Sequence, residues 1–257
     1  WIVGRFGPVA LWLTALALVG VLGAGLALIG GTIPAVRRAA GAARTWLAPH
    51  AWYLLALGGV WILAGSSLLQ LRIMSGHDAL EYLPRAMEFY AGLLGGEAFP
   101  RWAADLSAGY GQPFFSFNPP LFYYASTVFH VLGFSFVAAQ DLACLALLGV
   151  GALGMYALAC ETTGRRGGFV AATAYLMAPY LLAVLYVRHA LADLSGFVFV
   201  PWALWGVARA AGGGRRWAVP AGAVGIAAVL LSSNPVALMT VPAAVASRRS
   251  ARPSSRV

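Results

Sequence analysis

A short polar segment directly behind an apolar run holds the first residues that could do chemistry. This segment, SGHDALEYLPR (residues 75–85), contains His77, Asp78 and Glu81. A carboxylate such as Asp78 can take the proton of a hydroxyl nucleophile, and general-base catalysis of this kind typically contributes about 10²–10⁴-fold to a rate. The competing interpretation is structural, with Asp78 capping a helix and Glu81 completing a capping-box-like pair three residues later. The sequence alone leaves both roles open.

A second polar segment, YVRHALADLSG, lies between two apolar runs and holds Arg188, His189 and Asp193 within six residues. A charge at mid-membrane depth costs about 2.5–3.5 kcal/mol even on a lenient scale, so charged residues in apolar surroundings usually face water, a partner or a site. One interpretation is a self-neutralising pair at a membrane interface. The functional interpretation is a second half-site opposite Asp78.

The composition predicts an integral membrane protein. Of 257 residues, 61% are hydrophobic and 10% are charged, and the mean hydropathy is +0.78. Soluble domains carry about 25% charged residues, so a water-soluble fold would lack the charge to cover its surface. The net charge of +9 comes from arginine in short loops, a pattern typical of cytoplasmic loops rather than of a nucleic-acid groove. We therefore expect a lipid bilayer, and no nucleic acid, as partner.

Hydropathy predicts an all-α transmembrane bundle of about six or seven spans, since one crossing takes about 20 mostly apolar residues. The candidate spans are residues 8–30, 51–71, 139–160, 167–186, 195–208 and 217–232, and the run 119–137 is either a further span or a re-entrant or interfacial helix. We expect an N-terminal helix and basic loop over 1–50, a membrane domain over 51–245, and a basic tail over 246–257. Because the chain begins with Trp1 and ends in that tail, we expect a fragment of a longer protein.

Arginine predicts the orientation in the membrane, because basic residues concentrate in cytoplasmic loops. The loops expected in the cytoplasm contain Arg37, Arg38 and Arg44, then Arg165 and Arg166, then Arg209, Arg215 and Arg216. The outer loops are then residues 72–118 and 186–194. We expect the cytoplasmic membrane of a bacterium, with the site on its outer face.

The first outer loop is predicted to contain an amphipathic helix that lies in the membrane surface. Its polar positions at helical spacing are Asp78, Glu81, Arg85 and Glu88, and its apolar positions are Leu83, Met87, Tyr90 and Leu94. Pro84 removes a backbone hydrogen bond, so a kink or a later helix start is expected. Glu81 and Arg85 are four residues apart and are expected to form a solvated ion pair.

The order of these features resembles a known family of membrane proteins. The specific pieces are the Asp78 region, GYGQPFFSFNPPLFYY (residues 109–124) and the Arg-x-Ala-x-x-acid pattern of residues 188–193, followed by SSNPVALM (residues 232–239). Together they resemble the integral membrane proteins labelled "6-pyruvoyl-tetrahydropterin synthase-related", which are similar to the C-type (GT-C) membrane glycosyltransferases. The likeness covers about residues 51–245. It departs from the family where Asp193 replaces the usual glutamate and where residues 232–234 lack a histidine.

The resemblance implies transfer of a sugar from a polyprenyl-phosphate-linked donor at the outer membrane face. It implies that Asp78 acts as base or holds a divalent cation such as Mg²⁺ or Mn²⁺. Arg188 would neutralise the departing phosphate, and Asp193 would orient Arg188 or share the metal. The implied substrate-binding residues also include His77, His189 and Tyr110. The histidines have no metal-ligand spacing, so the three-histidine zinc site implied by the pterin label has no counterpart.

Two other functions remain open at this point. A transporter or flippase of lipid-linked glycans would also be a polytopic membrane protein, but such proteins usually show internal repeats and broken helices near the membrane midplane. We find no convincing repeat in the sequence. A non-catalytic membrane protein is the second alternative. No Walker sequence or strand-linked glycine motif indicates a nucleotide site.

Overall fold

The computed structural model describes residues 48–211 and 218–250. The chain divides into two compact units, Trp1–Ala56 and Leu57–Val257, and the contacts and the cavity described below lie in the second. Several predicted features lie outside the described residues: the span 8–30, the loops with Arg37, Arg38, Arg44, Arg215 and Arg216, and the tail beyond residue 250.

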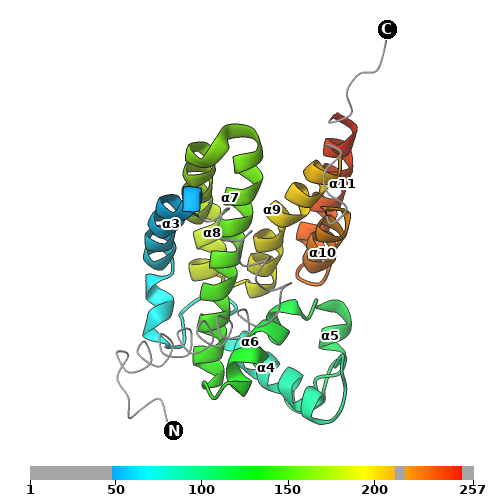
Figure 1. Cartoon of the computed structure of the whole chain (residues 1–257). Helices are drawn as coiled ribbons and strands as arrows, with labels where there is room; N and C mark the ends of the chain where they lie inside the picture. Colours follow the sequence, from blue (N-terminus) through cyan, green and yellow to red (C-terminus); the bar gives the residue numbers. More distant parts are fainter. Residues whose placement is uncertain (1–47, 212–217, 251–257) are drawn as a thin grey trace, which may run out of the picture. The chain divides into compact units, whose positions relative to one another are not determined.

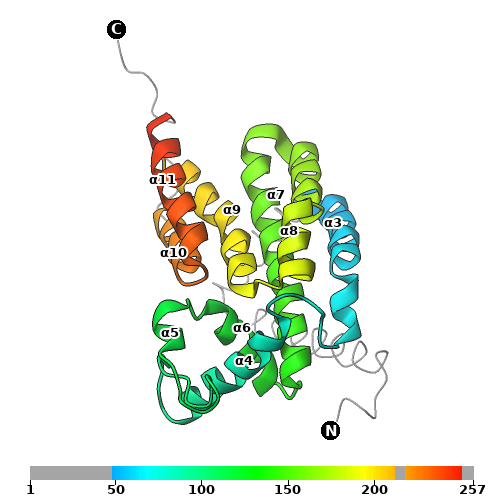
Figure 2. The same ribbon diagram turned by 180° about the vertical axis from the view of Figure 1, so that it is seen from behind.

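The described residues form helices joined by turns and loops, including a long loop over residues 95–113 between α4 and α5 (Figures 1 and 2). In chain order the main elements are α3 (Ala51–Ala64), η2 (Ser66–Gln70), α4 (Ala79–Leu94), α5 (Phe114–Phe117), α6 (Leu121–Val131), α7 (Phe136–Leu176), α8 (Pro179–Ala183), η3 (Val184–Arg188), α9 (Leu191–Ala211), α10 (Ala218–Leu230) and α11 (Asn234–Ser250). Within this part of the chain, β-structure is confined to an isolated bridge between Ala103 and Gln112. The predicted all-α class is confirmed.

Helix α7 is a hairpin of two antiparallel arms. Its backbone is helical except at Gly164, where φ is +70°, a conformation that glycine adopts at little steric cost. The arms pack closely, because a Cβ atom on Gly168 would lie 3.0 Å from the Tyr156 carbonyl oxygen and one on Gly151 would lie 3.1 Å from the Tyr175 ring. Figure 1 shows α7 turning back at its upper end, so both ends of the hairpin point toward α4 and α6.

Helices α9 and α10 pack against each other through small residues. A Cβ atom on Gly225 would lie 2.8 Å from the Ala203 backbone nitrogen, and one on Gly206 would overlap the Gly222 backbone. Small residues at such crossings let two helix backbones approach closely, as is common in membrane helix pairs. Beyond this crossing, the α10–α11 turn returns the chain to the first residues of α9, where Ser233 bonds to Asp193.

Helix α4 begins after Asp78, as one of the two predicted starts, and continues through Pro84. The alternative of a later helix start at Pro84 is wrong. Its buried residues are Ala79, Tyr82, Ala86 and Phe89. A second apolar stripe faces outward, with Leu80, Met87 and Leu94 exposed at 75%, 49% and 72%. The amphipathic helix therefore has two apolar sides, one packed in the protein and one open.

Two stretches of the described residues are long and apolar enough to cross a bilayer, Phe136–Arg188 and Leu191–Ala210. Core helices of soluble proteins can meet the same criterion. Helices α3, α6 and α10 contain 14, 11 and 13 residues. The prediction of about six or seven spans, each about 20 residues long, is therefore wrong for the described part of the chain. The apolar runs continue through turns, so their length overstated the length of the helices.

Candidate functional site

The two polar segments predicted to share a site lie side by side through their backbones. The His77 amide donates to the Val187 carbonyl at 3.1 Å, and the Asp78 amide donates to the Arg188 carbonyl at 3.1 Å. Gly76 permits this approach, since a Cβ atom there would lie 2.7 Å from Cβ of His189. The start of α4 is thereby joined to the turn between η3 and α9.

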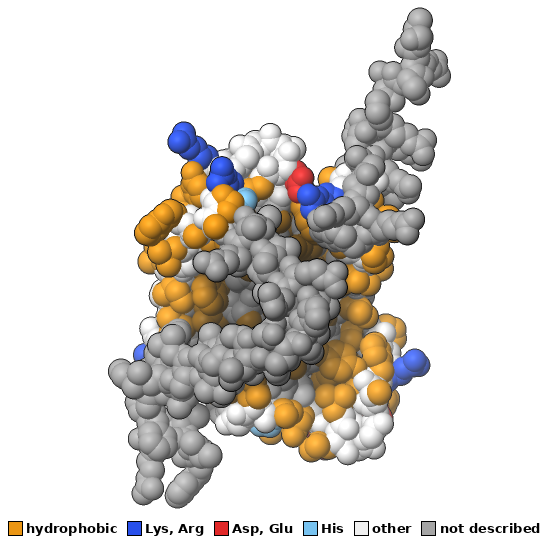
Figure 3. Space-filling view, in the orientation of Figure 1, with side chains coloured by type: hydrophobic (Ala, Val, Ile, Leu, Met, Phe, Trp, Pro, Cys, Tyr) orange, Lys and Arg blue, Asp and Glu red, His pale blue; other side chains and the backbone are white. Residues whose placement is uncertain are grey.

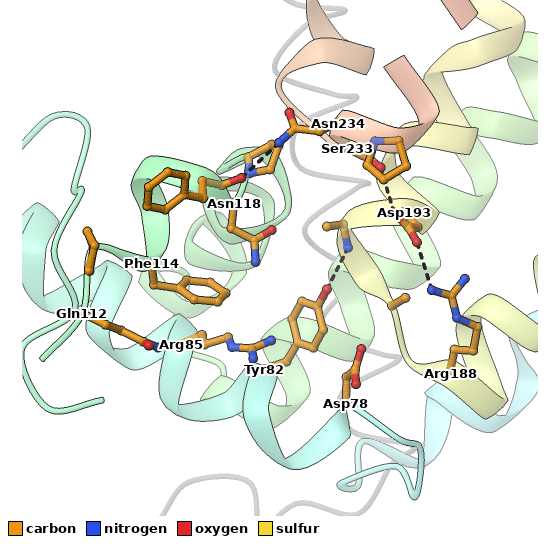
Figure 4. Close-up of a pocket in the computed structure, with 16 residues that line it drawn as sticks. Asp78, Tyr82, Arg85, Gln112, Phe114, Asn118, Arg188, Asp193, Ser233 and Asn234 are labelled. Atoms are coloured by element: carbon orange, nitrogen blue, oxygen red, sulfur yellow. Dashed lines mark hydrogen bonds and ion pairs between the residues drawn. The ribbon is translucent and has the colours of Figure 1, made fainter. Parts of the chain in front are cut away.

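A cavity of about 600 Å³ opens beside this junction (Figure 4). Four chain segments line it: the start of α4, the α5 region, the η3–α9 turn with the start of α9, and the α10–α11 turn. Its polar lining residues are Asp78, Tyr82, Arg85, Gln112, Asn118, Arg188, Asp193, Ser233 and Asn234. The volume falls within the range of about 300–1,000 Å³ that is usual for small-molecule sites.

Arg188 is fixed on one side of the cavity by two neighbours. Its Nη2 donates to Asp193 Oδ2 at 3.3 Å and its Nη1 donates to the Tyr180 hydroxyl at 3.3 Å. The other Asp193 oxygen, Oδ1, accepts a hydrogen bond from Ser233 Oγ at 2.7 Å. Both carboxylate oxygens of Asp193 thus have protein partners, which suits this residue for positioning Arg188.

The Asp78 carboxylate has a different environment. The residue occupies the N-cap position of α4 with φ −100° and ψ 6°, and its side chain makes no capping hydrogen bond. No side chain in the described residues donates a hydrogen bond to it, and it borders the cavity while half-buried. The capping-box interpretation is therefore wrong, because Glu81 pairs with Arg85 instead. A carboxylate left without a partner in a cavity is suited to accept a proton from a bound molecule.

Arg85 is a cavity residue that the sequence did not reveal as one. Its guanidinium carbon lies 4.4 Å from the centre of the Phe114 ring and 5.6 Å from that of Tyr82, and its side chain is 18% exposed. The expected pair with Glu81 forms, but it is not a freely solvated one. Phe114 follows Arg85 by 29 residues in the sequence, and no local sequence pattern predicts the contact between them.

Tyr82 lies between Arg85 and Arg188 in the cavity, and the sequence did not predict it as a site residue either. Its hydroxyl accepts a hydrogen bond from the Ala192 amide at 3.1 Å. Burial is the main cause that raises the pKa of Tyr82 to about 12, and the residue lines the cavity with its hydroxyl protonated at neutral pH.

The other predicted substrate-binding residues lie apart from the cavity lining. His77 is exposed and contributes its backbone. His189 is buried, with Nδ1 3.3 Å from the Leu185 carbonyl and its ring edge-on to Tyr82. Tyr110 is 89% exposed. The structure thus brings Asp78, Arg188 and Asp193 together at one cavity but does not place His77, His189 or Tyr110 in its lining.

The residues present do not by themselves fit the divalent cation predicted for Asp78 and Asp193. Within the described ranges no group of three or more His, Cys, Asp or Glu side chains could hold a metal ion. Asp193 also has both oxygens bonded to Arg188 and Ser233, and Mg²⁺ takes six oxygen ligands in a near-octahedral arrangement.

We expect acid to destabilise the protein partly through His189. Burial lowers the pKa of His189, opposed by the Leu185 carbonyl and the Asp78 charge. The unfolded chain then binds a proton at higher pH than the folded chain, so stability falls as pH drops below about 6.5, the ordinary histidine pKa. Thermal unfolding between pH 7.5 and 5.5 should show a smaller loss in His189→Asn, which tolerates the left-handed φ of +55° found there. An equal loss of thermal stability in the wild type and in His189→Asn would contradict this prediction.

Comparison with known proteins adds no assignment. No protein-family model matches the chain, and no curated protein and no solved structure shows a significant match. The resemblance to GT-C glycosyltransferases stays a prediction, and the cavity geometry is the observation on which a function can be built.

Proposed function

We propose that this protein is an integral membrane glycosyltransferase that moves a sugar from a polyprenyl-phosphate-linked donor to an acceptor at the outer membrane face. The observation that carries the proposal is the pairing, in one cavity, of an unpartnered carboxylate, Asp78, with a fixed guanidinium, Arg188. In glycosyl transfer from a lipid phosphate, a carboxylate can assist the nucleophile and a guanidinium can assist the leaving group.

The surface chemistry supports membrane integration. Large apolar side chains are exposed along the long helices, including Leu153 and Val170 on α7, Val224 on α10 and Leu238 on α11. Figure 3 shows hydrophobic side chains on either side of the centre of the visible face, with charged side chains mainly at its upper end and at its lower edges. A 53-residue helical stretch is far longer than one crossing. We therefore assign one crossing to the first arm of α7, one to its second arm together with α8 and η3, and one to α9.

This arrangement indicates on which side of the membrane the cavity lies. Glu161, near the α7 turn, pairs with Arg209 near the end of α9 at 3.1 Å, and Arg165 and Arg166 lie in the same turn. Asp193 lies 16 residues before Arg209 on α9, a separation of about 24 Å along the helix axis. The arginine-rich end is cytoplasmic by the positive-inside bias, which places the cavity at the outer end.

The residues support separate roles for Asp78 and Arg188 in the transfer. The acceptor hydroxyl oxygen attacks the anomeric carbon, the bond from that carbon to the phosphate oxygen breaks, and the lipid phosphate leaves with the bonding electrons. Asp78 takes the hydroxyl proton. Arg188, held by Asp193 and Tyr180, stabilises the charge that develops on the phosphate, and fixed donors of this kind favour the transition state over the substrate.

Transfer of radiolabelled sugar by the purified full chain in lipid nanodiscs tests this proposal. We expect turnover with polyprenyl-phosphate-linked hexose donors and none with the corresponding nucleotide-linked sugars, because the lipid chain anchors the donor at the membrane boundary. Donors should be tested with a mixture of oligosaccharide and peptide acceptors. Absence of transfer from every lipid-linked donor would remove the enzymatic proposal.

A further inference from the structure

The cavity has two chemically different ends. Asp78, Arg188 and Asp193 occupy one end, and we call the other the amide–aromatic end, formed by Gln112, Phe114, Phe117, Asn118 and Asn234. Arg85 and Tyr82 lie between the two ends (Figure 4). The steps assigned to Asp78 and Arg188 use none of the amide–aromatic residues, so this end is available for a second ligand group.

Two of the three carboxamides of this end, Gln112 and Asn234, are held in place by the protein. Gln112 Oε1 accepts a hydrogen bond from Ser107 Oγ at 3.1 Å, which leaves its NH₂ group as a donor. Asn234 Nδ2 donates to the Phe117 carbonyl at 3.0 Å, which leaves its side-chain oxygen as an acceptor. The Asn118 side chain has no partner among the described residues, and Figure 4 shows it directed into the cavity.

Aromatic rings flank these amides. Phe117 is 76% exposed, while one face of Phe114 carries the Arg85 guanidinium at 4.4 Å. The backbone under this end is fixed, because Ala103 and Gln112 exchange two hydrogen bonds of 2.9 Å. The end therefore combines an open aromatic face with uncharged donors and acceptors, of which those of Gln112 and Asn234 are oriented by protein hydrogen bonds.

We propose that the amide–aromatic end binds a saccharide, and that the acceptor of the transfer is a carbohydrate rather than a protein side chain. A pyranose ring has an apolar C–H face that can lie on an aromatic ring, and hydroxyls around its edge that both donate and accept. Carboxamides match neighbouring hydroxyls because each offers both roles. The identity of this saccharide as the acceptor rests on the proposed function, whereas its binding does not.

Saturation-transfer difference NMR on the full chain in nanodiscs tests the inference directly. The probes are the methyl glycosides of glucose, galactose, mannose and N-acetylglucosamine, with a short serine- and threonine-containing peptide as the competing acceptor class. We expect at least one glycoside to bind and the peptide not to bind. Phe117→Ala and Asn118→Ala should each weaken binding by about three- to tenfold, as expected for loss of one aromatic contact or one neutral hydrogen bond.

Phe99→Ala is the matched control, because Phe99 is also exposed, at 46%, and does not line the cavity. It should leave glycoside binding unchanged, and circular dichroism should show that all three variants fold. No glycoside signal in the wild type, binding of the peptide alone, or undiminished binding in both cavity variants would each overturn the inference. Glycoside binding without transfer from any lipid-linked donor would overturn the proposed function and leave the saccharide site standing.

Discussion

Replacement of Asp78 by asparagine should lower the turnover of sugar transfer by about 10²–10⁴-fold, the usual contribution of a general base. Asparagine has the same shape but cannot take a proton from the acceptor hydroxyl. The donor KM should stay within about twofold, because a group that acts only in the transition state contributes to kcat rather than to ground-state binding. Initial rates with a radiolabelled lipid-linked donor measure both quantities.

The substitution should leave the fold intact, which makes the result interpretable. The Asp78 side chain makes no capping hydrogen bond to α4, so the helix loses no bond when the carboxylate becomes an amide. Glu97→Gln is the matched control, since Glu97 is an exposed carboxylate just after the end of α4 and does not line the cavity. Equal turnover in Asp78→Asn, Glu97→Gln and the wild type would remove Asp78 from the chemistry.

Gly206→Ala should destabilise the protein by about 1–3 kcal/mol, the usual cost of overpacking a tight contact. The added methyl would overlap the backbone of Gly222 on α10, and a backbone has no rotamer through which to move aside. Helices α9 and α10 would have to separate. Asp193 and the turn with Ser233, which together line the cavity, would then also move apart. Thermal unfolding in detergent, followed by circular dichroism, measures the loss.

Gly58→Ala is the control, and it is expected to change the stability in the opposite direction. Gly58 is also in a helix, α3, and a Cβ atom there would meet no described atom within 4 Å. Without a clash the substitution should stabilise the protein by about 0.5–1 kcal/mol, because alanine loses less backbone entropy in a helix than glycine does. If both substitutions stabilise, the close crossing of α9 and α10 is wrong.

The sequence predicts those features that depend on neighbouring residues. The all-α class follows from long apolar runs, and α4 begins after Asp78 as predicted although the predicted capping bond does not form. The apolar runs did not predict the number of spans, since α3, α6 and α10 end sooner than the runs do. Hydrophobicity reports burial or lipid contact, but a turn can be as apolar as a helix.

Some residues of the candidate site can be predicted from the local sequence, whereas others depend on contacts between distant segments. Arg188, Asp193 and Asp78 stand out because charges are rare in this chain and these lie beside apolar runs. Arg85 forms an ordinary helical pair with Glu81, and its place over Phe114 depends on the fold of the intervening segment. The bond from Ser233 to Asp193 joins residues 40 positions apart and requires the α9–α10 crossing, which no motif in the sequence specifies.

Sidedness labelling of single cysteines tests most directly whether a catalytic cavity lies on the outer membrane face. In a background where alanine replaces Cys144 and Cys160, Tyr110→Cys marks the exposed segment proposed to lie outside and Arg166→Cys marks the exposed α7 turn. We expect a membrane-impermeant maleimide to label position 110 in intact cells and position 166 only after permeabilisation. Labelling of position 166 but not 110 in intact cells would put the cavity in the cytoplasm, where the proposed transfer at the outer face is impossible.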